Sequence, residues 1–447
     1  MRGVRVPPNG CSVLPAQFHK LIDRCRALLA GDRLLRGFGL LGLGEFIVRA
    51  TRVLTAVALA RMLDPVELGI AATAITCYEL IRILANNGLG QMVVRATPAE
   101  LDATCNTADW LIRRICIAMT VLQVAAGAVI AHVASEPRLF AMIACLAASY
   151  LTMPPGMVQS WLLQREQRMG AIAGISTTQT TADNLIAALL AVTGFGAWSI
   201  VLPKLLTTPV WLIGVRRTRP WQRNAAAGRL PLQAMWRYSA PILASEILGA
   251  VRVNADKMLV AAILGIEALG VYFFAFSAGY GLSAGLTGAL TAASFPHLAA
   301  TLSTRELLEK FDRAIRRLAL PICVLVSLQA SAIVVYVPLF FGAKWQPFVP
   351  IVMVLCLSAV TKPCSDLAVQ LLRAAGMPGL ELRASLVFTA ALLASFALAL
   401  PYGLMPGVIV IAVVSITLQA AFAWWARNQV RALLEDPPNA LLPHSRT

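Results

Sequence analysis

The stretch Gly42-Leu-Gly-Glu-Phe-Ile-Val-Arg-Ala-Thr-Arg52 places three formal charges inside an apolar segment that runs from about residue 37 to residue 60. The segment is long enough to cross a bilayer as a helix. Glu45, Arg49 and Arg52 are spaced i, i+4, i+7, so they project within about 60° of one another on a helix. Because a charge at the bilayer centre costs at least about 2.5 kcal/mol, we expect this stripe to face a protein interior or a wet cavity. A Glu–Arg ion pair that joins two helices is the alternative.

The composition is that of a membrane protein with many spans. Hydrophobic residues make up 58% of the 447 residues, charged residues only 13%, and the mean hydropathy is +0.72. Soluble proteins lie far from these values. Residues 1–36 form a basic tail without the pattern of a cleaved signal, and residues 21–35 suit an amphipathic helix on the membrane surface.

Cysteines and histidines are scattered along the chain. The nine cysteines form no C-x-x-C pair, and the four histidines have no metal-binding spacing. We therefore expect no disulfide framework, no metal site and no cofactor.

Twelve apolar segments follow one another along the chain, and the shorter ones still reach roughly 28 Å as helices. The predicted spans are 37–60, 67–90, 110–132, 139–161, 170–193, 196–214, 239–263, 268–291, 317–340, 349–372, 381–400 and 405–425. Their fold class is an all-α integral membrane protein. Prolines inside several spans predict bent helices, which suit a protein that alternates between two openings.

The basic residues predict the orientation. Of 38 lysines and arginines, 28 fall in the tails, the inner loops and their flanks if the N-terminus is inside, and only three fall in outer loops. Such an excess marks the cytoplasmic side, so both termini are predicted to be cytoplasmic. The same bias accounts for most of the net charge of +16, and no nucleic-acid partner is needed to explain it.

The chain is predicted to consist of two six-helix halves joined by a basic loop at 215–238. Glu45 and Glu246 are 201 residues apart, and the same offset places Leu63-x5-Gly69 on Leu264-x5-Gly270. Six spans return the chain to its starting side, so the halves would be parallel repeats around a central cavity. The predicted parts are a tail at 1–36, lobes at 37–214 and 239–425, the linker at 215–238, and a tail at 426–447.

Further charges lie within the spans. Arg252 and Asp256 are i, i+4 neighbours, while Glu246 and Lys257 project about 20° apart. Other charges of this kind are Glu79 with Arg82, Asp183, Lys204, and Lys362 with Asp366. Six acids nearly balance seven bases, so mutual ion pairing is the structural alternative to a role in transport. Residues 176–184 are also too polar for contact with lipid.

Three stretches resemble the polysaccharide flippase family, the Wzx-type branch of the multidrug/oligosaccharidyl-lipid/polysaccharide superfamily. They are Leu63-Asp-Pro-Val-Glu-Leu-Gly69, the segment that starts Leu162-Leu-Gln-Arg-Glu-Gln, and Asn254-Ala-Asp-Lys-Met-Leu-Val with the residues 264–272 beyond it. A small-residue turn at 371–378 is similar too. The resemblance covers roughly residues 37–425.

The resemblance implies a two-lobed transporter, not an enzyme, in the bacterial inner membrane. Its substrate would be an oligosaccharide linked to an isoprenoid pyrophosphate of the undecaprenyl type. Arginine suits phosphate oxygens, so the candidate substrate-binding residues are Arg49, Arg52, Arg82, Arg252 and Lys257. Glu45, Glu246 and Asp256 are candidates to take a coupling proton or sodium ion. Membrane lipids, a polysaccharide polymerase and glycosyltransferases are the expected partners.

Two other functions remain open from the sequence. A multidrug or small-solute cation antiporter of the same superfamily would share the bundle. A membrane-embedded glycosyltransferase or ligase would need large loops with clusters of acids, histidine or arginine, and the outer loops here are only a few residues long.

Overall fold

The computed structural model describes residues 33–85, 87–281 and 303–435, in which all the regular secondary structure is helical. The first half contains α2 (Arg33–Met62), α3 (Pro65–Arg82), α4 (Leu89–Arg95), α5 (Leu101–Val133), α6 (Pro137–Thr152), α7 (Pro154–Arg165), α8 (Met169–Val192), α9 (Trp198–Leu206) and α10 (Thr208–Thr218). The second half contains α11 (Leu232–Ala275), α13 (Thr304–Ala314), α14 (Leu320–Tyr336), α15 (Val349–Leu357), α16 (Lys362–Ala374), α17 (Pro378–Ala399) and α18 (Leu404–Glu435). Short 3-10 or π-helical turns adjoin them at 83–85, 225–227, 276–280, 315–319, 337–341, 343–348 and 400–402.

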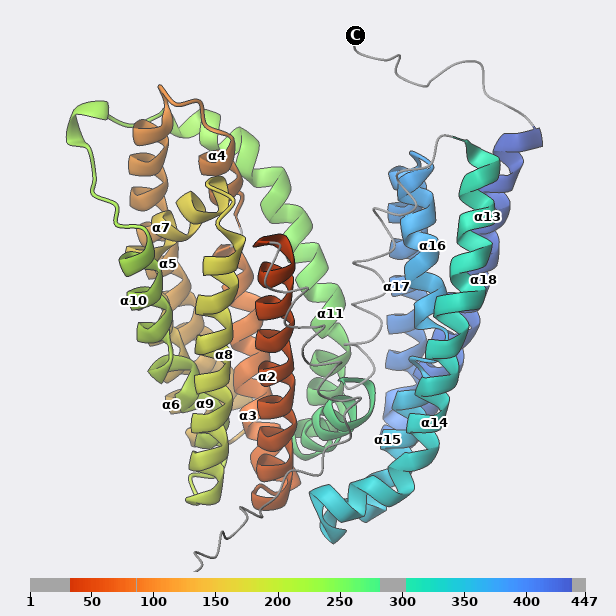
Figure 1. Ribbon diagram of the computed structural model, residues 1–447. Helices are drawn as coiled ribbons and strands as arrows, with labels where there is room; N and C mark the ends of the chain where they lie inside the picture. The colour runs from red at the N-terminus through yellow and green to blue at the C-terminus, as the bar shows by residue number, and fades with distance from the viewer. Residues whose placement is uncertain (1–32, 86, 282–302, 436–447) are drawn as a thin grey trace, which may run out of the picture.

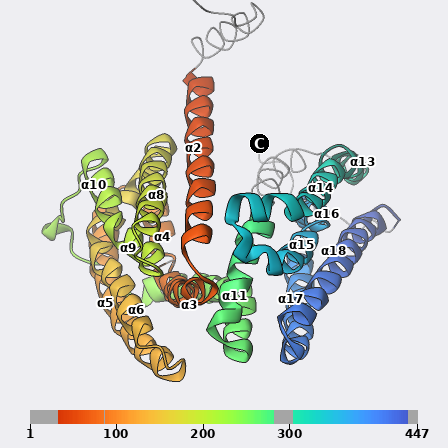
Figure 2. The same ribbon diagram turned by 90° about the horizontal axis from the view of Figure 1, so that it is seen from below.

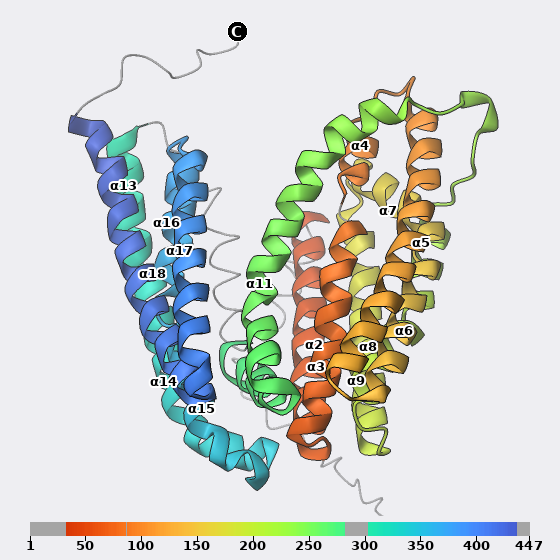
Figure 3. The same cartoon turned by 180° about the vertical axis from the view of Figure 1, so that it is seen from behind.

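The helices form two groups. Figure 1 shows α2–α10 on one side, α13–α18 on the other, and α11 running from the first group toward the space between them. The same division is visible from behind in Figure 3 and from below in Figure 2, where α2 lies between the groups. An all-helical membrane fold is therefore confirmed, while the predicted lobe and linker boundaries stay predictions.

Fewer helices qualify as spans than the twelve that the sequence predicts. Among the described residues, eight helices are long and apolar enough to cross a membrane, or nine if the bent pair α6 and α7 is one span. The helices α2 and α8 are 30 and 24 residues long. Neither qualifies, and the charges of α2 and the polar run of α8 are the sequence features that make them less apolar than the others. The predicted span 268–291 continues beyond residue 281, outside the described residues.

The helix α11 is interrupted at Gly265, whose φ of 86° and ψ of −176° are not helical. Glycine tolerates this backbone conformation because it has no Cβ. The break turns the segment that starts at Ile266 back against the preceding part of α11, so that Tyr272 meets Asp256. A prediction of two separate spans at 239–263 and 268–291 matches this break.

The two glycines that the 201-residue offset pairs lie at one helix crossing. A Cβ on Gly69 would come within 1.9 Å of the Ile266 carbonyl oxygen, and one on Gly270 within 1.8 Å of the Pro65 carbonyl oxygen. The backbones of α3 and α11 are therefore in direct contact. Small residues allow such close crossings in membrane bundles.

The two ends of the bundle differ. We call the end with Arg95, Arg165 and Arg216 the basic end, and the end with residues 61–65 and 337–348 the closed end. At the closed end, Trp345 donates from Nε1 to the Ala60 carbonyl at 2.6 Å. Its indole is fully buried in a core that includes residues of both groups.

Two cations strengthen the closed end. Arg61 donates to the carbonyls of Leu339 and Phe340 at 2.8 and 2.7 Å. Lys344 donates to the carbonyls of Arg61 and Leu63 at 3.0 and 2.6 Å. These bonds tie the segment 61–63 to the turns 337–341 and 343–348 after α14, and Lys344 also lies 3.6 Å from the exposed Asp64 carboxylate.

Candidate functional site

A cavity of about 600 Å³ lies within the first group of helices, and we call it the N cavity. It is enclosed by α3, α6, α7, α8, α9 and α10. Serine, threonine and glutamine side chains alternate there with aromatic ones. The lining includes Tyr78, Glu79, Arg82, Ser160, Trp161, Gln164, Ser176, Gln179, Thr180, Asp183, Lys204, Thr207, Thr208 and Trp211. Such a surface offers hydrogen bonds to a polar ligand as well as flat apolar faces.

The charged groups of the N cavity are paired. Lys204 Nζ lies 2.6 Å from Asp183 Oδ2, and the lysine and aspartate side chains are 37% and 14% exposed. Arg82 contacts Glu79 at 3.3 Å, with half of its side chain exposed. The exposed arginine therefore retains donors for a ligand, whereas Asp183 already has its counter-charge in contact.

A break between α9 and α10 forms the wall of the N cavity next to Lys204. The hydroxyls of Thr207 and Thr208 donate to the carbonyls of Pro203 and Lys204, each at 2.8 Å. The Pro203 carbonyl also accepts from the Thr207 backbone N–H at 3.0 Å, so the threonine side chains add hydrogen bonds to carbonyls at the end of α9. In membrane proteins, non-helical backbone within the bilayer is found where it is buried in protein or lines a cavity.

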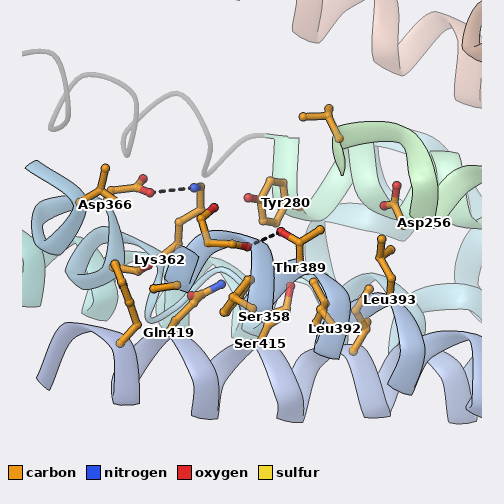
Figure 4. A pocket seen from close by; sticks show the side chains of 18 of the residues that line it. Asp256, Tyr280, Ser358, Lys362, Asp366, Thr389, Leu392, Leu393, Ser415 and Gln419 are labelled. Carbon is orange, nitrogen blue, oxygen red and sulfur yellow. Dashed lines mark hydrogen bonds and ion pairs between the residues drawn. The ribbon is translucent and has the colours of Figure 1, made fainter. Parts of the chain in front are cut away.

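A second cavity of about 510 Å³ lies in the other group, and we call it the C cavity. Its lining comes from α11, the turn 276–280, and α15 to α18, and it includes Asp256, Tyr280, Ser358, Lys362, Asp366, Thr389, Leu392, Leu393, Ser415 and Gln419. Figure 4 shows Lys362 directed toward Asp366, at 2.9 Å, with Tyr280 nearby and Asp256 at the far side. Leucine, valine and phenylalanine side chains cover more of this cavity than of the N cavity.

Asp256 is the acid of the C cavity with the least charge compensation. Its Oδ2 accepts a hydrogen bond from the Tyr272 hydroxyl at 2.7 Å. Its buried Oδ1 has no hydrogen-bond partner among the described residues. The ammonium of Lys257 lies 3.7 Å from Oδ1, but it donates to the Val253 carbonyl at 3.2 Å and stands 4.9 Å from the centre of the Phe276 ring.

Both cavities lie on the basic side of the closed end. Arg82 ends α3, and Gln164 is one residue from the end of α7, close to the loop with Arg165 and Arg168. In the C cavity, Arg373 and Glu381 flank the loop between α16 and α17. The ribbons of the two groups approach each other at the opposite end (Figure 1). The two groups of helices therefore meet at the closed end, and charged cavity residues lie toward the basic end.

The structure places the eight predicted residues in different surroundings. Arg82 lines the N cavity and Asp256 the C cavity, while Lys257 is buried beside Asp256. Arg49 and Arg52 are exposed on α2, and Glu246 is half-buried on α11. These three do not line any of the cavities described for residues 33–85, 87–281 and 303–435. The side chains of Glu45 and Arg252 lie outside the described residues.

Sequence reasoning missed two contacts of the site. It treated Asp183 and Lys204 as separate charges, because they are 21 positions apart in the sequence and a turn at 193–197 lies between them. It did not connect Asp256 with Tyr272, because the contact depends on the break at Gly265. A polar run in one span and a lone lysine in the next were the signals that could have suggested the first pair.

Comparison with known proteins gives a consistent result. Residues 58–350 match the family described as "Polysaccharide biosynthesis protein". The chain is 23% identical over 312 residues to the lipopolysaccharide biosynthesis protein WzxC of Escherichia coli (strain K12), and 23% identical over 221 residues to the succinoglycan biosynthesis transport protein ExoT of Rhizobium meliloti (strain 1021). The matches cover 67% and 49% of this chain, but only 61% and 44% of those relatives.

Solved structures show the same fold. The chain matches an inward-facing multidrug resistance MATE family transporter of the MOP superfamily with a TM-score of 0.66 at 14% identity, covering 87% of this chain and 96% of that one. It matches the lipid II flippase MurJ with a TM-score of 0.66 at 10% identity, covering 90% and 94%. At such identities the likeness establishes the fold alone.

Proposed function

This chain belongs to the polysaccharide biosynthesis protein family, and from that membership we propose that it moves a lipid-linked oligosaccharide across a membrane. The substrate class is an oligosaccharide repeat unit on an isoprenoid pyrophosphate of the undecaprenyl type. Its polar head would pass through the protein while the lipid chain stays in the bilayer. The products would supply surface polysaccharide or exopolysaccharide synthesis, with glycosyltransferases acting before this step and a polymerase after it.

One observation carries the proposal: two cavities with charged residues in their linings, one in each group of helices, lie on the same side of a closed end. A static helix bundle has no need of two such cavities. A transporter that works by alternating access needs them, because its halves rock around a central site and expose it to one side at a time. The bonds of Arg61, Lys344 and Trp345 are the contacts that must break before the other end opens.

The N cavity is the better site for the sugar and pyrophosphate. It combines the half-exposed guanidinium of Arg82 with hydroxyl, amide and aromatic side chains. A guanidinium can bind a phosphate through two parallel hydrogen bonds. Arg49, Arg52 and Arg252 remain candidates to bind the same pyrophosphate head. A rocking motion of the two halves would change which surroundings the side chains of α2 and α11 meet.

Asp256 is the strongest of the three coupling candidates. A carboxylate with one oxygen on a neutral hydroxyl and the other unbonded has room for a proton or a sodium ion. Asp183, in contrast, already contacts an ammonium. Glu45 and Glu246 stay candidates from their equivalent places in the two halves.

We infer a bacterial inner membrane location with both termini in the cytoplasm, so that the basic end and both cavities face inward. The excess of basic residues in the loops of that end supports this orientation. Reporter fusions near Gln167 and Ala226 should give cytoplasmic signals, and fusions near Ala134, Gly194 and Ala343 periplasmic ones. A periplasmic signal at Ala226 would contradict the orientation.

A multidrug or small-solute antiporter is the second candidate, because it shares the fold. The family membership favours the flippase. A glycosyltransferase or ligase is disfavoured by the same membership and by the transporter fold.

A deletion strain tests the proposal. Cells without the protein should accumulate the lipid-linked precursor in the cytoplasmic leaflet and lose polymer, and the cloned gene should restore both. Normal polymer output in the deletion strain, with no precursor accumulation, would refute the flippase assignment.

A further inference from the structure

A third cavity, of about 410 Å³, lies on the outer side of the first group of helices and is separate from the two cavities described above. We call it the arginine pocket. Four arginines line it, Arg113, Arg216, Arg223 and Arg229, together with Trp110 and Trp221. Figures 1 and 3 show α5, α10 and the connection to α11 at the edge of the molecule, far from α13–α18. The helix α7 separates it from the N cavity, since Pro155 and Gln159 line the pocket and Met157 and Trp161 the cavity.

The pocket has an excess of positive charge. Arg113 pairs with Asp109 at 3.0 Å, and Arg229 lies over the Trp110 ring at 5.0 Å from its centre. Arg216 and Arg223 are exposed and form no ion pair among the described residues. Three arginines thus gather without a carboxylate of their own, which is unfavourable unless an anion or solvent compensates for them.

The pocket is a built structure rather than a loose surface cluster. Asn106 is buried and donates from Nδ2 to the carbonyls of Asn224 and Gly228 at 2.7 and 3.0 Å. The Thr107 hydroxyl accepts from the Leu230 backbone at 2.8 Å. These bonds hold the segment 221–230 against α5 and so position Arg223 and Arg229.

The same amide leaves an unused acceptor. The two carbonyl partners fix which end of the Asn106 side chain is nitrogen, because only the NH₂ group can donate to them. Oδ1 is buried and has no hydrogen-bond partner among the described residues. A buried carbonyl oxygen without a partner costs free energy, so a ligand that supplies a hydroxyl donor would be stabilised here.

The depth of the pocket matches the level of lipid headgroups. From Ile115 to Val133 the helix α5 carries no formal charge, which is roughly 28 Å of helix and close to the hydrocarbon thickness. Arg113 and Arg114 therefore stand at the edge of the hydrocarbon. Ile117 and Val121 follow Arg113 at i+4 and i+8, and they are 57% and 64% exposed. An apolar stripe thus runs along α5 from the pocket toward the bilayer centre.

We propose that the arginine pocket binds an anionic phospholipid whose headgroup carries a hydroxyl, such as phosphatidylglycerol. The arginines contact the phosphate, Asn106 Oδ1 accepts from the headgroup hydroxyl, and an acyl chain lies along Ile117 and Val121. Basic pockets at the membrane surface bind anionic headgroups in this way, and arginine forms the two-bonded phosphate contact. The site is distinct from the N cavity, and its occupancy does not depend on the transported substrate.

Native mass spectrometry of the full-length protein, with defined lipids added in detergent, tests the proposal. We expect phosphatidylglycerol to bind roughly tenfold or more tightly than phosphatidylcholine, and Arg216→Gln/Arg223→Gln to lose roughly tenfold in phosphatidylglycerol affinity. The matched control, Arg217→Gln/Arg383→Gln, removes two exposed arginines that do not line the pocket and should bind as the wild type does. Equal affinity for the two lipids, or equal losses in both variants, would overturn the proposal.

Two further ligands identify the source of the phosphate and the role of Asn106. Inorganic phosphate at millimolar concentration should not displace phosphatidylglycerol, and complete displacement would assign the pocket to a free anion instead. Phosphatidylmethanol has the same charge and no headgroup hydroxyl, so it should bind several-fold more weakly than phosphatidylglycerol. Equal binding of these two lipids would remove the hydroxyl contact from the proposal.

Discussion

The N cavity and the C cavity each contain an aspartate with one bonded and one unbonded carboxylate oxygen, but the bonded oxygens meet different partners. Asp183 contacts the ammonium of Lys204 at 2.6 Å. Asp256 accepts from the neutral Tyr272 hydroxyl at 2.7 Å, and its nearest cation, Lys257, is 3.7 Å away and bonded elsewhere. The first acid is compensated by the protein itself. The second has capacity for a proton or a cation from solution, so the two halves are suited to different tasks.

Two glycines lie where α3 and α11 touch. Gly69 and Gly270 hold equivalent places under the 201-residue offset, and each would bring a Cβ within 2 Å of a backbone oxygen of the other segment. We expect Gly69→Ala and Gly270→Ala to destabilise the protein equally, by about 3 kcal/mol or more, because a backbone atom cannot yield as a side chain can. Thermal unfolding in detergent measures this. As a control, Gly249→Ala meets nothing within 4 Å and should be neutral. A large effect at only one of the two glycines would break the equivalence.

The ion pair of the N cavity should matter for stability. Asp183→Asn leaves Lys204 without its counter-charge, and we expect a loss of roughly 2 to 4 kcal/mol, reduced from a fully buried pair because Lys204 is about one third exposed. The double change Asp183→Asn/Lys204→Met should recover most of the loss. Membrane abundance and unfolding temperature provide the readout, and a stable Asp183→Asn single variant would show that the pair is dispensable.

Asp256→Asn should change transport and leave stability unaffected, unlike Asp183→Asn. The amide oxygen can still accept from Tyr272, so the protein should keep its abundance. The increase in transport rate that an ion gradient produces should fall at least about tenfold. Asp366→Asn, in the same cavity but next to Lys362, is the matched comparison and should act mainly on stability. If gradient dependence survives in Asp256→Asn and disappears in Glu45→Gln or Glu246→Gln, coupling belongs to those glutamates.

Arg82 supplies the smallest of the expected changes. Arg82→Lys keeps the charge but loses the planar fork, so transport should fall several-fold while abundance stays the same. Its exposed pair with Glu79 contributes at most about 1 kcal/mol to stability. Transport by Arg52→Lys and by Arg252→Lys, normalised to protein level, shows whether the arginines of α2 and α11 also bind the pyrophosphate head of the substrate. Normal transport in all three would exclude an arginine phosphate clamp.

The sequence predicted the membrane class, the family and most helix positions, because apolar runs and basic loops report directly on the bilayer. The equivalence of Gly69 and Gly270 in two repeats stays a prediction, although both glycines lie at one close helix crossing. The sequence could not predict how Asp183 reaches Lys204 or how Tyr272 returns to Asp256, since both contacts depend on turns between spans. Among the described residues, α2 and α8 match two of the predicted spans but are less apolar than the eight helices that qualify by composition, and polar residues on them contact each other. For example, the Asn184 amide on α8 donates a hydrogen bond to the Thr51 hydroxyl on α2 at 3.0 Å.

The most direct test of the central claim uses purified protein in liposomes that contain an isoprenoid-pyrophosphate-linked oligosaccharide. A membrane-impermeant sugar-modifying enzyme outside the liposomes reports how much substrate has crossed from the inner leaflet. We predict translocation by the wild type, a several-fold lower rate in Arg82→Lys, and loss of the gradient response in Asp256→Asn. An absence of lipid-linked sugar translocation by protein that exchanges a small cationic solute would contradict the account and favour the antiporter.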